Sequence, residues 1–331
     1  MSTGVRKLTY SLAINEALKQ MMKLDDSVFI IGQGVKSPWY VGNTCKDLIK
    51  LYGEGRVIDT PISENAMTGA AVGASIAGMK PVVMHPRADF SLYAFDPIIN
   101  QAANWSYMNG GRASCPVVFW LAVNRGGEQA AQHSQALHSL FAHIPGLKVV
   151  APSNAYDAKG LMISAIKDPD PVIFIDDRWL YGKYCNVPET IYEIEIGKGQ
   201  IRNSGKDVTV VASSYLVHES EISIENLKNE GISVELIDLR SIKPIDIDLV
   251  VQSVKKTGRL VIVDGSWETG SIASDISAKI NEHCFGSLKA PVGRICLPDS
   301  PAPSSRTLEA AYYIAENRIG KKIKEVVNFE N

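Results

Sequence analysis

The chain has 331 residues, a net charge of −2 and 45% hydrophobic residues, a globular composition with ample material for a core. This balance of charge argues against a polyanion as the main partner, so we expect no binding to nucleic acid. The N-terminal segment lacks the apolar core of a signal peptide, and no apolar run reaches the roughly 18 residues of a membrane span. The five cysteines are scattered without a CxxC pair, which indicates a reducing compartment. We therefore expect a cytoplasmic protein that does not bind a membrane.

Short β-branched runs alternate with helix-length stretches through the first half of the chain. We expect strands at 28–32, 56–59, 81–85, 116–123, 147–151 and 171–175. We expect helices at 9–23, 64–78, 95–108 and 156–167. The alternation predicts a mainly parallel sheet with helices on both faces.

A polar, glycine-bearing stretch at 186–206 interrupts the pattern and is predicted to be a domain linker. After it we expect strands at 208–213, 233–238, 259–263 and 292–296 and helices near 216–229, 246–255 and 270–282. The sequence thus predicts an α/β protein of two doubly wound domains, residues 1–185 and a smaller domain at 207–331.

The most informative segment is DTPISENAMTGAAVG (59–73), in which a buried strand leads through Ser63 and Glu64 into a helix of small residues. Ser63 is a candidate N-cap, and the small residues would let a helix or a partner subunit approach closely. Glu64 follows the carboxyl end of a strand, where open α/β sheets bind ligands, so it is a candidate acid or base. The alternative is a first-turn glutamate that only complements the helix dipole.

This segment resembles the glutamate segment of a known family, the beta subunits of the thiamine-diphosphate-dependent decarboxylating component of 2-oxoacid dehydrogenases. The resemblance, to the pyruvate and branched-chain type, continues in order through DFSLYAFDPIINQAANWSYMNGG (89–111), AQHSQALHSLFAHIPGLKVVAPSNAYDAKGL (131–161) and DLRSIKPID (238–246). It implies a pyrimidine-binding first domain and a smaller transketolase C-terminal-like second domain. The match covers nearly the whole chain.

The resemblance implies a cofactor site in the first domain. Glu64 would form a hydrogen bond with the ring nitrogen of the cofactor's aminopyrimidine, and Phe90 would pack on that ring. Ile62 would line the same pocket through its apolar side chain. On spacing alone, Phe90 could equally be an ordinary core residue.

His133 aligns with the family's active-site histidine, which contacts the substrate. Without the resemblance, a histidine between Gln132 and Ser134 reads as a structural, hydrogen-bonded residue. His138 and His143 lie five and ten residues further on, spacings that do not place all three histidines on one helix face. We therefore expect no triple-histidine metal site, and we interpret His138 and His143 as packing or interface residues.

The stretch SAIKDPDPV (164–172) resembles the loop that surrounds a structural monovalent cation in this family. By position, the ligands of a potassium ion would be Val117, Ala165, Asp168 and Asp170, mainly through backbone carbonyls. A plain Asp-Pro turn after a helix is the alternative.

The family's alpha subunits hold the cofactor's diphosphate through a divalent metal and a Gly-Asp-Gly motif, which this chain lacks. The resemblance therefore implies an alpha subunit that holds magnesium and completes the thiamine diphosphate site in an α2β2 heterotetramer. The substrate would be a small 2-oxo acid, with the acyl group passed to a lipoyl acyltransferase core that docks on the second domain.

Some positions depart from the family pattern. Gln33 replaces an acid, while Met84 and Trp120 stand where pyruvate-type proteins carry an acid and a base, which suggests that an ion pair was lost as a unit. Arg87 and Arg125 border the predicted site and indicate either an anionic substrate or surface substitutions. Two alternatives to the dehydrogenase therefore stay open. One is a split transketolase or acyloin-forming carboligase acting on an aldehyde or sugar, and the other is a non-catalytic scaffold subunit.

Overall fold

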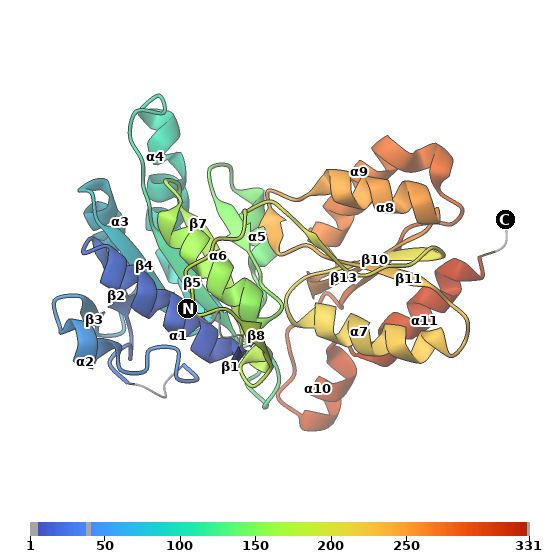
Figure 1. The fold of residues 1–331 in the computed structure, drawn as a ribbon, viewed down its shortest axis with the longest axis horizontal. Coiled ribbons are helices and arrows are strands. Elements are labelled where there is room, and N and C mark those ends of the chain that lie inside the picture. Colours follow the sequence, from blue (N-terminus) through green and yellow to red (C-terminus); the bar gives the residue numbers. More distant parts are fainter. Residues whose placement is uncertain (1–5, 38–40, 330–331) are drawn as a thin grey trace.

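The computed structural model describes residues 6–37 and 41–329 of the chain. They form two α/β domains that lie side by side, the first around a seven-stranded sheet and the second around a five-stranded sheet (Figure 1). The predicted fold class, two doubly wound domains with mainly parallel sheets, is confirmed.

The first sheet has the strand order β12-β6-β7-β5-β4-β2-β3, and all strands except β12 are parallel. The parallel strands are β2 (Val28–Gly32), β3 (Val57–Asp59), β4 (Lys80–His85), β5 (Val118–Val123), β6 (Lys148–Val150) and β7 (Val172–Asp177). Helices cover both faces, so β2, β5 and β7 are buried along their whole length. This burial explains their uninterrupted apolar sequences.

Alternate residues of each strand point to opposite faces of this sheet and meet different helices. On one face Ile30 packs in the same cluster as α1 (Tyr10–Leu24) and α6 (Ala155–Lys167). On the other face Ile31 packs with α3 (Glu64–Ile76). On that face the predicted helix at 95–108 is a π-helix, η2 (Asp96–Ala102), followed by α4 (Ala103–Met108).

The second sheet has the order β14-β13-β10-β11-β9 and is parallel except for β9. Its strands are β9 (Gln200–Asn203), β10 (Val208–Ala212), β11 (Val234–Asp238), β13 (Leu260–Trp267) and β14 (Gly293–Leu297). On one face of this sheet α8 (Ile247–Thr257) lies with α9 (Ile272–Cys284), and on the other α7 (Tyr215–Lys228) lies with α11 (Glu316–Val327) (Figure 1). A short helix, α10 (Arg306–Tyr312), precedes α11. No helix of the described ranges is both long and apolar enough to cross a bilayer.

One strand that follows the linker crosses back into the first sheet. In the first domain, β8 (Tyr184–Val187) pairs with β1 (Arg6–Thr9), whereas β9 lies inside the predicted linker and joins the second sheet. The chain then returns, because β12 (Ser241–Lys243) follows β11 yet pairs antiparallel with β6 at the edge of the first sheet. The domains are therefore connected twice, by the linker and by β12, which forms the edge of the first sheet although it follows β11 of the second.

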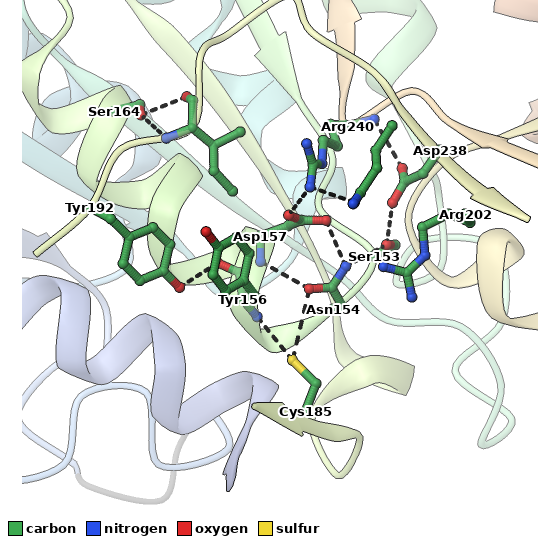
Figure 2. A network of polar contacts seen from close by, with 12 residues as sticks. Ser153, Asn154, Tyr156, Asp157, Ser164, Cys185, Tyr192, Arg202, Asp238 and Arg240 are labelled. Atoms are coloured by element: carbon green, nitrogen blue, oxygen red, sulfur yellow. Dashed lines mark hydrogen bonds and ion pairs between the residues drawn. The ribbon is translucent and has the colours of Figure 1, made fainter. Parts of the chain in front are cut away.

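A polar network joins the start of α6 to the second domain (Figure 2). The Arg240 guanidinium donates to Asp157 Oδ1 at 2.7 Å and to Gln200 Oε1 at 2.5 Å. Ser153 donates to the Asp238 carboxylate, which also accepts the Arg240 backbone N–H at 3.0 Å. Burial and the nearby Asp157 carboxylate raise the pKa of Asp238. The Arg240 guanidinium and backbone thus connect three segments that are distant in the sequence.

Met84 and Trp120 lie opposite each other on β4 and β5, and both are fully buried. The structure therefore places side by side the two positions at which an acid and a base are replaced. The Trp120 indole donates to Asp176 Oδ2 at 2.8 Å, and the Tyr181 hydroxyl donates to the same oxygen at 2.7 Å. Burial nevertheless raises the pKa of Asp176 to about 7.

We predict that Asp176→Asn flattens the dependence of stability on pH. The folded state holds the Asp176 proton more tightly than the unfolded state, so its contribution to the free energy of unfolding falls as pH rises from about 4 to about 7. At one pKa unit per 1.4 kcal/mol, the full loss is on the order of 4 kcal/mol. Asparagine keeps an oxygen acceptor for both donors and does not ionise.

Urea titrations across this pH range check the prediction. Asp176→Asn should gain stability over the wild type as pH rises, whereas Asp26→Asn, at an exposed side chain, should not. A stability difference between Asp176→Asn and the wild type that is the same at every pH would contradict it.

Candidate functional site

A pocket of about 470 Å³ lies beyond the carboxyl ends of β2, β3 and β4. Its lining residues are Gln33, Ile62, Glu64, Pro86, Arg87, Phe90, Tyr93 and His133. The structure thus brings together all four residues predicted for the cofactor and the substrate, which come from three separate segments of the chain. The location agrees with the general rule that parallel α/β sheets bind ligands at this edge.

Glu64 is the first residue of α3 and is only 9% exposed. The helix N-terminus favours its negative charge, and Gln33 Nε2 donates to Glu64 Oε1 at 2.9 Å. Ser63 occupies the N-cap position as predicted, but its side chain makes no capping hydrogen bond. The first turn of α3 therefore keeps backbone donors that Ser63 does not satisfy.

Phe90 and His133 contact each other in the wall of the pocket. Their rings meet edge to face, with centroids 5.2 Å apart and an interplanar angle of 86°. Next to them, the buried Asp89 carboxylate accepts the backbone N–H of Gln135 at 3.1 Å, and burial raises the pKa of Asp89 above its ordinary value. This hydrogen bond ties the His133 segment to the segment that carries Phe90.

The second domain holds the loop that carries His133. Both carboxylate oxygens of Glu309, on α10, accept the backbone N–H of Glu128 at 3.1 Å. Glu128 and Ala130 have φ angles of 61° and 60°, a left-handed conformation that side chains other than glycine adopt at a cost. The His133 N–H then donates to the Ala130 carbonyl at 3.4 Å. Sequence reasoning missed Glu309, because nothing in its local pattern connects it to a loop 181 residues earlier.

The two arginines near the predicted site have different environments. Arg87 lines the pocket, and its guanidinium donates to the Pro86 carbonyl at 2.8 Å and to Gln129 Oε1 at 3.4 Å. Arg125 lies outside the pocket, buried 3.0 Å from the Asp177 carboxylate. Arg125 is thus neither a surface residue nor a pocket residue, because it balances a buried charge at the end of β7.

The comparisons with known proteins agree with this geometry. A family model described as the pyrimidine-binding domain of transketolase matches residues 6–183, and one described as the transketolase C-terminal domain matches residues 197–319. An acetoin:2,6-dichlorophenolindophenol oxidoreductase beta subunit from Cupriavidus necator is 46% identical, over 93% of this chain and 94% of its own. A pyruvate dehydrogenase E1 component beta subunit from Rickettsia felis is 40% identical, over 97% and 98%. A 2-oxoisovalerate dehydrogenase beta subunit from Bacillus subtilis is 36% identical, over 97% and 99%.

The chain belongs to the beta-subunit family of 2-oxoacid dehydrogenases. This finding confirms the family that the sequence motifs indicated, and the family depends on thiamine diphosphate. Among solved structures, a split-gene transketolase described as an inactive beta4 tetramer superimposes with a TM-score of 0.79 over 98% of this chain and 99% of its own. At 21% sequence identity it supports the fold alone.

The loop predicted to hold a cation lies between the end of α6 and β7. The Lys148 ammonium lies 2.7 Å from the Asp168 carboxylate and 3.1 Å from that of Asp170. The single charge of Lys148 balances only one of the two carboxylates, so the loop keeps a net negative charge, and the oxygens expected for an ion are mainly backbone carbonyls such as those of Val117 and Ala165. Within the described ranges, no three His, Cys, Asp or Glu side chains gather as a metal site.

The other two histidines of the segment lie outside the pocket. His138 Nε2 is 2.7 Å from Asp264 Oδ1 on β13, so this buried histidine packs against the second domain, as predicted for an interface residue. Burial opposes ionisation of Asp264, but His138 and Ser266 outweigh it and lower the pKa to about 2. His143 is exposed at the end of α5 (His138–His143), so it does not pack within the chain, and its assignment as an interface residue stays a prediction.

We predict that Glu309→Ala lowers kcat/KM, assayed with the alpha partner that the family implies, roughly 10- to 100-fold, the value of one lost hydrogen bond to a charged group. The reason is that Glu128 loses its acceptor and the His133 loop relaxes from its left-handed conformation. Glu309→Gln should restore most of the activity, since its amide oxygen can still accept the N–H.

Steady-state kinetics of the three proteins checks this role. The control is Arg306→Ala, on the same helix, which removes only an exposed ion pair with the Glu128 side chain. Equal losses in Glu309→Ala and Arg306→Ala would mean that α10 as a whole matters rather than this carboxylate.

Proposed function

We propose that the chain is the beta subunit of a thiamine-diphosphate-dependent dehydrogenase that decarboxylates a 2-oxo acid and passes the acyl group to a lipoyl acceptor. The observation that carries the proposal is the buried Glu64 carboxylate, which shares one pocket with Phe90 and His133 in a chain of the 2-oxoacid dehydrogenase family. A carboxylate, an aromatic ring and an imidazole suit a heteroaromatic cofactor and a polar substrate.

The residues of the pocket fit the aminopyrimidine end of thiamine diphosphate. When bound, this cofactor supplies the carbon nucleophile that attacks the substrate carbonyl. Glu64 holds a proton between its carboxylate and the ring nitrogen, while Phe90 and Ile62 orient the ring through apolar contact. His133, which lines the same pocket and contacts the Phe90 ring, binds the substrate and positions its carbonyl.

We further propose that an alpha subunit completes the site and holds the cofactor's diphosphate and magnesium in an α2β2 heterotetramer. At the pocket, Ile62 is 82% and Tyr93 is 73% exposed, which is unusual for large apolar side chains beside a ligand. On α3, a side chain at Gly69 or Gly73 would meet nothing within 4 Å. A partner seated here would bury this surface and exclude water from the cofactor.

Acetoin cleavage is a second candidate function, because the relative with 46% identity is an acetoin oxidoreductase beta subunit. Acetoin carries no charge, whereas a 2-oxo acid carries a carboxylate that suits the guanidinium of Arg87 in the pocket. An assay of the alpha–beta complex with an artificial electron acceptor and pyruvate, 2-oxoisovalerate or acetoin separates the two. Turnover of acetoin alone would replace the 2-oxo acid as the substrate.

Replacing Glu64 with glutamine is the direct test of the chemistry. The amide cannot give a proton to the ring nitrogen, so we expect kcat to fall by several orders of magnitude while calorimetric affinity for thiamine diphosphate stays within a few fold. Glu282→Gln, at an exposed position on α9, is the matched control and should retain full activity. A fully active Glu64→Gln complex would favour the scaffold alternative instead.

We also propose a potassium ion in the loop of Asp168 and Asp170, held by carbonyls that include those of Val117 and Ala165. The negative end of the α6 dipole and the two carboxylates favour a cation there, in addition to Lys148. Potassium chloride should raise the melting temperature above that in choline chloride of equal ionic strength, and this increase should level off at high potassium concentration. Identical melting curves in the two salts would argue for a plain Asp-Pro turn.

A further inference from the structure

Gln33 directly follows β2, at a point where the backbone has little freedom. A side chain on Gly32 would come within 2.5 Å of the Met84 carbonyl oxygen, so β2 and β4 approach more closely there than any other residue would allow. The Gly32 carbonyl also accepts the N–H of Thr60 at 3.1 Å. This close packing of backbone segments fixes the direction in which Gln33 enters the pocket.

The Gln33 side chain forms a hydrogen bond with Glu64. Its Nε2 donates to Glu64 Oε1 at 2.9 Å, and the two residues are 8% and 9% exposed. Over the ranges that the structure describes, this is the side-chain hydrogen bond that the Glu64 carboxylate accepts. One carboxylate oxygen is therefore anchored to the strand end, and the second is left to meet a ligand in the pocket.

We propose that Gln33 is a positioning residue that holds Glu64 by one oxygen and favours transfer of the Glu64 proton to the cofactor's ring nitrogen. This rests on the proposed function. A donor to a carboxylate stabilises its ionised form, the form that Glu64 adopts once the ring nitrogen has the proton. The amide donates without ionising, so the effect does not change with pH.

Two variants of similar length separate donation from packing. Gln33→Met fills the space without a donor, and we expect kcat to fall roughly 10- to 100-fold at every pH, the value of one hydrogen bond to a charged group. Gln33→Glu places a second carboxyl group against Glu64, so the two share a proton. Its activity relative to the wild type should decline as pH rises, because its own carboxyl donates to Glu64 only while it is protonated. The matched control is Gln252→Glu, at an exposed position on α8.

Cofactor affinity gives a readout independent of turnover. Titration calorimetry of thiamine diphosphate with magnesium into the alpha–beta complex should show that raising the pH lowers the affinity of Gln33→Glu relative to the wild type, but leaves the ratio of Gln33→Met to the wild type unchanged. Wild-type kcat in Gln33→Met, or wild-type pH profiles in Gln33→Glu, would overturn the positioning role. If the wild-type complex binds no thiamine diphosphate, or Glu64→Gln stays active, the proposed function itself fails and this role fails with it.

Discussion

The arrangement of the site depends on one carboxylate that is kept largely out of water at the first residue of a helix. Burying an ionised group is expensive unless donors compensate it, and here the helix N-terminus and the Gln33 amide do so. Both donors exist only because β2 and β3 end at the same edge of a parallel sheet. The topology of the first domain therefore determines which groups surround the Glu64 carboxylate.

The second domain contributes to the same pocket without lining it. Glu309 holds the loop of His133, and Asp264 receives His138 a few residues further along the chain. Both contacts use carboxylates of the second domain to hold a segment of the first. The smaller domain therefore supports a pocket to which it contributes no lining residue, since all lining residues precede residue 134.

Much of the fold could be predicted from the sequence, because the central strands are continuous apolar runs between helix-length segments. Most elements that escaped prediction are short, such as β12, which has three residues and whose pairing with β6 depends on tertiary contact rather than on local propensity. The exception is α11, a helix of 12 residues that the sequence analysis did not predict. Glu64 and His133 were predicted through a resemblance to known proteins, since a first-turn glutamate and a lone histidine carry little signal alone. The Gln33–Glu64 contact and the support from Glu309 join residues 31 and 181 positions apart, a relation that no local pattern contains.

The return of β12 to the first sheet limits how this chain can be divided. A fragment that stopped at the linker would lose the strand that covers β6, and would present unpaired backbone donors and acceptors along a sheet edge. Bare edges of this kind recruit strands from other molecules, which leads to aggregation. The two domains are thus not interchangeable modules, and a shuffled or truncated gene product would lack a protected edge even with every residue of the pocket intact.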